Sequence, residues 1–117
     1  MSDEHFLNRK GFLDKESILS LVSDEQVFSL VFGFEPKEYD RVCSPLREDT
    51  TASCYFENNI NSGRLELIDW ASEKPHIDSF ECVMRYYKLP NFYLALNFVE
   101  KHLIEGKKLR PIVKTVP

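Results

Sequence analysis

The middle of the chain alternates between polar and apolar positions with a period of two, the pattern of a β-strand with one buried face. Residues 53–57 form a run rich in aromatic side chains, and residues 64–69 alternate before an unbroken Leu67-Ile68. Residues 58–63 lie between these runs and consist mainly of asparagine, serine and glycine, which favour turns. The pattern predicts an antiparallel hairpin.

Apolar residues recur at helical spacing on both sides of this hairpin. Two short helices are expected before it, over residues 15–22 and 25–31. Asp14 and either Ser23 or Asp24 precede these segments, and such side chains are favoured at helix N-caps.

Two further helices are expected after the hairpin. Asp78 or Ser79 would cap the first, which runs to about residue 88. Asn91 would cap the second, which Gly106 would close. Helices with so short a connection pack against each other as a helical hairpin.

These elements predict an α+β fold: a small antiparallel sheet built on the central hairpin and free of metal, flanked by amino-terminal helices and a carboxy-terminal helical hairpin. Its 117 residues, 43% of them hydrophobic, suffice for one core. We expect a flexible arm over residues 1–13, the domain over residues 14–106, and a basic linker or tail over residues 107–117.

Cysteine content and hydropathy indicate the compartment. The three cysteines are an odd number at irregular spacing, which argues against a secreted disulfide framework. Cys54 and Cys82 are expected to pack in the core. No apolar run reaches the roughly 20 residues that a membrane span needs, and the acidic start differs from a signal peptide. A cytoplasmic location is expected.

Three segments of the chain carry a resemblance: SPLREDTTASCYF, LIDWASE and DSFECVMRYY. In this order they resemble the zinc-ribbon domain at the amino terminus of bacterial and phage DNA primases. Ser44 to Arg47 falls where that family has Cys-Pro-Phe-His, and residues 68–71 fall approximately at its second cysteine pair. Because every metal ligand is missing, the chain resembles a degenerate variant without zinc, of a kind expected from a bacteriophage, and no cofactor is expected.

The resemblance implies a non-catalytic module that recognises the DNA template in a primase-like replication protein. Such a module would hold single-stranded DNA and present it to a primase polymerase or helicase domain, in the host cytoplasm if a phage encodes it. The expected DNA-binding residues are four cations for phosphates and one aromatic ring for a base: Arg41, Arg47, Arg64, Lys74 and Tyr55.

Structural roles compete with this interpretation at several residues. Arg47 could instead form an ion pair with Asp69 across the hairpin. Tyr55 and Phe56 point to opposite faces of a strand, so we expect Phe56 in the core and Tyr55 outside. Trp70 is expected in the core rather than as a stacking platform.

The charge distribution favours a different function. The net charge is −4, but residues 1–106 carry 11 basic against 19 acidic side chains, and an acidic body disfavours nonspecific binding of nucleic acid. The alternative is a protein interaction module that binds a replication partner or inhibits a host factor. No catalytic triad pattern and no glycine-rich phosphate loop is present, so the sequence gives no ground for an enzyme.

Overall fold

The structure is a computed structural model that describes residues 14–105. It has the α+β fold that the sequence predicts, with four α-helices and a four-stranded antiparallel sheet among the described residues. The elements in chain order are α1 (Lys15–Leu19), α2 (Asp24–Phe32), β1 (Arg41–Val42), β2 (Cys54–Asn58), β3 (Leu65–Ile68), β4 (His76–Ile77), α3 (Ser79–Tyr86), α4 (Phe92–Val99) and a π-helix, η2 (Glu100–Glu105). The expected arm, tail and closing Gly106 lie outside the described residues.

Side-chain caps start the helices where the sequence predicts. Asp14 accepts a hydrogen bond from the backbone N–H of Ser17 at 2.9 Å. Ser23 forms a capping box with Gln26 at the start of α2. Asn91 caps α4. The helix α1 ends at Leu19, earlier than the expected residue 22, and the last helix changes to a π-helix at Glu100.

The central hairpin is confirmed, and two outer strands extend it. The strand order is β1-β2-β3-β4 with every pair antiparallel. Both outer strands have only two residues, too few to show an alternating pattern in the sequence.

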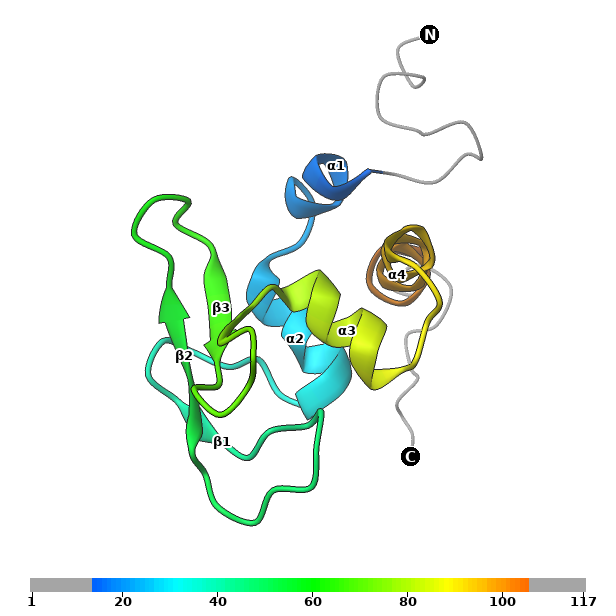
Figure 1. Cartoon of the computed structure of the whole chain (residues 1–117). Helices are drawn as coiled ribbons and strands as arrows, with labels where there is room; N and C mark the ends of the chain where they lie inside the picture. The colour runs from blue at the N-terminus through cyan, green and yellow to red at the C-terminus, as the bar shows by residue number, and fades with distance from the viewer. Residues whose placement is uncertain (1–13, 106–117) are drawn as a thin grey trace, which may run out of the picture.

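One face of the sheet packs against the helices. Phe56, Leu67 and Ile77 are paired across the three strands β2, β3 and β4 and are fully buried. The ring of Phe28 in α2 meets Phe56 edge to face at a centroid distance of 5.1 Å. In Figure 1 the helices α2 and α3 lie on one side of the sheet, with α4 beyond α3.

A second core holds the helices together. It contains apolar side chains from all four α-helices and from the turn after α1: Ile18, Val22, Val27, Phe80, Val83, Leu96 and Val99. Cys54 and Cys82 are buried in the core under the sheet, as expected. The two clusters together hold the sheet against the helices, and the other face of the sheet is left uncovered.

Candidate functional site

The other face of the sheet carries a row of side chains that the helices do not cover. In register across the four strands, the row is Arg41, Tyr55, Ile68 and His76. Trp70 follows β3 and contacts the ring of His76 edge to face at 5.7 Å. These five residues are called the outer face below.

Hydrogen bonds fix the aromatic side chains of the outer face. The indole N–H of Trp70 donates to the Tyr55 hydroxyl at 3.1 Å, and His76 Nδ1 lies 3.1 Å from Glu66 Oε1. Ile68 is almost fully buried between Tyr55 and His76 although no helix lies over it. The rings therefore form an ordered surface, with the Glu66 carboxylate beside it, rather than a set of independent side chains.

The structure corrects the expectation for Trp70. Its exposed fraction is 63%, whereas Phe56 is fully buried and Tyr55 partly exposed, as predicted. Its contacts with Tyr55 and His76 place Trp70 on the outer face. Because β3 ends at Ile68, no strand pattern in the sequence indicated this position. Sequence reasoning also missed His76, since the short strand β4 that places it shows no pattern.

Arg47 is held by carboxylates, as the structural alternative predicted. Its Nε and Nη2 donate to Asp69 at 3.3 and 2.9 Å, and Nη1 lies 3.7 Å from Asp49. The hydrogen bonds from Arg47 lower the pKa of the Asp69 carboxyl below its ordinary value of 3.8. Asp69 also accepts from the backbone N–H of Ala71 at 3.1 Å, so it ties the turn before β2 to the loop after β3.

Arg64 is also engaged, in a network that links the hairpin to two helix starts. Its Nε and Nη2 donate to Asp24 at 3.1 and 2.8 Å, and Nη2 lies 2.6 Å from Asp78. Lys15 reaches the same Asp78 oxygen at 3.1 Å, and Ser79 donates to Asp24 at 2.5 Å. Burial raises the pKa of Asp78, but Arg64 and Lys15 outweigh it and the pKa is lowered overall.

Lys74 is the third cation with a carboxylate partner. It lies 3.1 Å from Glu81, which also pairs with Arg85 at 3.5 Å. Arg41 differs from these residues, because it is exposed and no ion pair within residues 14–105 holds it. Of the five expected DNA-binding residues, only Arg41 and Tyr55 belong to the outer face.

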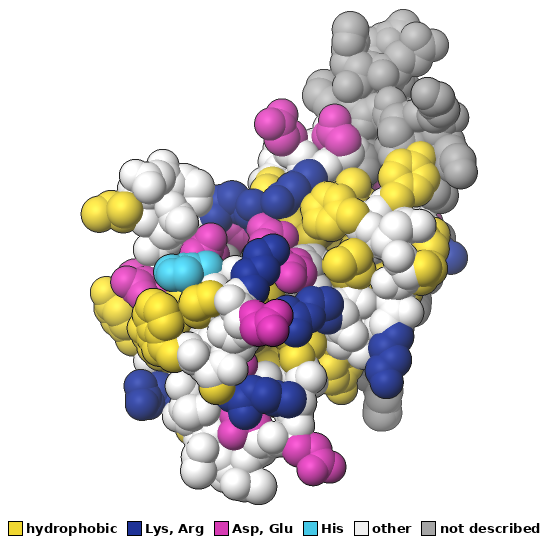
Figure 2. All heavy atoms as spheres, in the orientation of Figure 1, with side chains coloured by type: hydrophobic (Ala, Val, Ile, Leu, Met, Phe, Trp, Pro, Cys, Tyr) yellow, Lys and Arg dark blue, Asp and Glu magenta, His cyan; other side chains and the backbone are white. Residues whose placement is uncertain are grey.

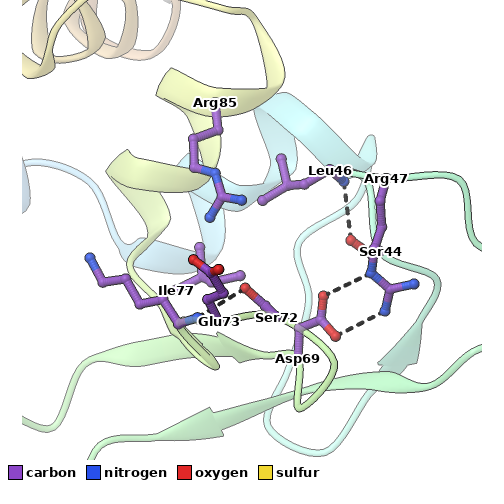
Figure 3. A pocket seen from close by; sticks show the side chains of 9 residues that line it. Ser44, Leu46, Arg47, Asp69, Ser72, Glu73, Ile77 and Arg85 are labelled. Carbon is purple, nitrogen blue, oxygen red and sulfur yellow. Dashed lines mark hydrogen bonds and ion pairs between the residues drawn. The ribbon is translucent and has the colours of Figure 1, made fainter.

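A cleft of about 420 Å³ lies between the end of the sheet and α3. Its walls are the turn at residues 44–47, the loop at residues 69–74, and α3, as Figure 3 shows. The pair of Arg47 with Asp69 forms one side, and Arg85 reaches in from α3. Ser44 and Ser72 also line it, so two residue pairs with the same three-residue spacing converge on this cleft.

Charges of both signs are mixed over the surface around the cleft. Figure 2 shows Lys and Arg side chains interleaved with Asp and Glu, and hydrophobic side chains beside a histidine. Within residues 14–105, no three His, Cys, Asp or Glu side chains are grouped so as to hold a metal ion. In the same part of the chain, every helix is too short or too polar to cross a bilayer.

Comparison with known proteins gives no relative. No family model matches the chain, and neither a curated protein nor a solved structure is significantly similar to it.

Proposed function

We propose that this chain is a non-catalytic module of a primase-like replication protein, encoded by a phage and acting in the host cytoplasm, which binds single-stranded DNA on its outer face. The observation that carries the proposal is the uncovered sheet face with Tyr55 and Trp70 joined by a hydrogen bond. Unpaired bases stack on exposed aromatic rings at about 1–3 kcal/mol per base. Arg41, which pairs directly across from Tyr55, would contact a backbone phosphate.

The cleft supports the resemblance to a zinc ribbon. Zinc sites take ligands in closely spaced pairs. Here Ser44 and Arg47 stand where the resemblance has its first ligand pair, and Asp69, from the segment 68–71 that approximates the second pair, lines the same cleft. The ion pair of Arg47 with Asp69 would take over the task of joining the two halves of the ribbon.

The test is fluorescence anisotropy of a labelled single-stranded oligonucleotide at low and at physiological salt. Saturable binding that weakens with salt is expected, and Arg41→Gln should reduce the salt slope by roughly 0.7, the value for one phosphate contact to a single strand. Lys101→Gln is the control, because it removes the same charge from an exposed position in η2. Absence of binding at low salt would refute the proposal.

A second function is favoured by the charge pairing. Arg47, Arg64 and Lys74 are all neutralised by carboxylates, and residues 14–105 contain nine basic against seventeen acidic side chains. Under this alternative, the outer face binds a protein, either a partner from the replication complex or a host factor that the chain inhibits. Its test is capture of a partner from infected or host lysate by the wild-type chain but not by Trp70→Ala.

A further inference from the structure

The cleft has the size of a small-molecule site and an apolar side. Ligand pockets generally measure about 300–1,000 Å³, and this cleft of about 420 Å³ lies within that range. Leu46 and Ile77 form its apolar lining. Ile77, in β4, is fully buried in the core under the sheet, whereas Leu46, in the turn before β2, is only half-buried. Leu46 is therefore the apolar side chain that a flat ring in the cleft could contact.

The charge balance of the cleft disfavours an anion. Its lining contains the cations Arg47, Lys74 and Arg85 together with the anions Asp69 and Glu73. Asp69 holds Arg47, and Glu81 pairs with both Lys74 and Arg85. Each of the three cations thus has a carboxylate partner, and Glu73 adds a further negative charge, so no excess positive charge is left for a phosphate group and the ligand that fits is polar and uncharged.

Donor and acceptor groups nevertheless meet in the cleft. Figure 3 shows the Arg85 guanidinium extending from α3 toward the Glu73 carboxylate on the loop opposite. No ion pair between these two side chains is found within the described residues. A carboxylate only accepts hydrogen bonds and a guanidinium only donates them, so a ligand between them must offer both an N–H group and an acceptor on one edge.

We propose that the cleft accepts one unpaired nucleobase, whose flat face lies against Leu46 and whose polar edge meets Glu73 and Arg85. Nucleobases are neutral planar rings that carry N–H donors beside oxygen or nitrogen acceptors. The inference rests on the proposed function. Trp70 and Glu73 belong to the same loop, in which Trp70 contacts the outer face and Glu73 lines the cleft, so this loop would contact the bound strand at both places.

The experiment is NMR titration of the ¹⁵N-labelled full chain with each of the four deoxynucleoside 5′-monophosphates, and separately with inorganic phosphate. At least one nucleotide is expected to give saturable shifts in the backbone amides of Ser72 and Glu73 and in the Arg85 Nε–H signal. Inorganic phosphate is expected to leave them unchanged. Equal shifts with inorganic phosphate would overturn the inference in favour of an anion site.

The substitution Glu73→Gln tests the edge contact, and Glu35→Gln, which removes the same charge elsewhere, is its control. Glu73→Gln should lower the affinity for the nucleotide roughly three- to tenfold, the effect of one net hydrogen bond. Glu35 is exposed in another part of the surface, so Glu35→Gln should leave this affinity unchanged. Equal affinity of both variants would overturn the inference. If no nucleotide shifts the cleft signals while an oligonucleotide still binds the outer face, the cleft inference fails and the proposed function stands; if neither binds, both fail.

Discussion

Arg47 and Arg41 are both arginines beside the sheet, but their surroundings give them opposite roles. Arg47 donates two hydrogen bonds to Asp69, whose side chain is only 5% exposed. Arg41 extends from the edge strand without such a partner among the described residues. A buried carboxylate that loses its only cation is left with an uncompensated desolvation cost, so Arg47 stabilises the hairpin whether or not DNA is bound.

We therefore predict that Arg47→Ala lowers the melting temperature and leaves the affinity for single-stranded DNA unchanged below the transition. Arg41→Ala should leave the melting temperature nearly unchanged and weaken the binding of single-stranded DNA. Thermal unfolding followed by circular dichroism, together with the anisotropy titration of both variants, measures the two effects. Reduced DNA affinity in a fully folded Arg47→Ala protein would show that this arginine contacts DNA.

The pKa of Asp69 makes part of the stability depend on pH. The folded state lowers this pKa below 3.8 through the hydrogen bonds from Arg47. A carboxyl with a depressed pKa stabilises the folded state fully above its unfolded value and loses that contribution as the pH falls through the folded value. Asp69→Asn should therefore be less stable than wild type at neutral pH, by a margin that shrinks below about pH 3.8. Urea unfolding from pH 2 to pH 7 measures this margin, and a constant margin would contradict the assignment.

At the scale of elements, Arg64 joins parts of the chain that local patterns treat separately. It contacts Asp24 at the start of α2 and Asp78 at the N-cap of α3. Both carboxylates lie at helix N-termini, where the helix dipole favours negative charge. The arginine at the end of the hairpin loop thus orients the sheet relative to two helices.

Arg64→Ala should lower the free energy of unfolding by about 1.5–3 kcal/mol, the range for hydrogen bonds to charged groups. Urea denaturation measures the loss, and Arg41→Ala, as an exposed arginine, should change stability by less than about 0.5 kcal/mol. A similarly small change for Arg64→Ala would mean that the network contributes little and that Arg64 is free for another role.

The sequence predicted the elements because their signals are local. N-cap side chains, the two-residue alternation of β2 and β3, and the helical spacing of apolar residues each act within a few positions. The partners of Arg64 are not local, since Asp24 lies 40 residues away, and no pattern in the sequence relates the two. Trp70 was assigned to the core, and because it lies in the turn after β3 ends at Ile68, strand alternation could not correct this assignment. The pairing of Arg47 with Asp69 was predicted because both flank the same hairpin.

For the whole molecule, the arrangement of layers determines which surface is available. The helices cover one face of the sheet and leave the outer face uncovered. That exposed surface has a natural reporter, because Trp70 is the only tryptophan in the chain. A change in tryptophan fluorescence therefore reports a change in the surroundings of Trp70, in the loop that adjoins the outer face.

The most direct measurement is titration of the Trp70 fluorescence with an unlabelled single-stranded oligonucleotide at low and at physiological salt. We predict saturable quenching, because a base stacked on Tyr55 and Trp70 contacts the indole directly, with weaker binding at the higher salt. Fluorescence that stays unchanged at low salt, where phosphate contacts are strongest, would contradict DNA binding at the outer face.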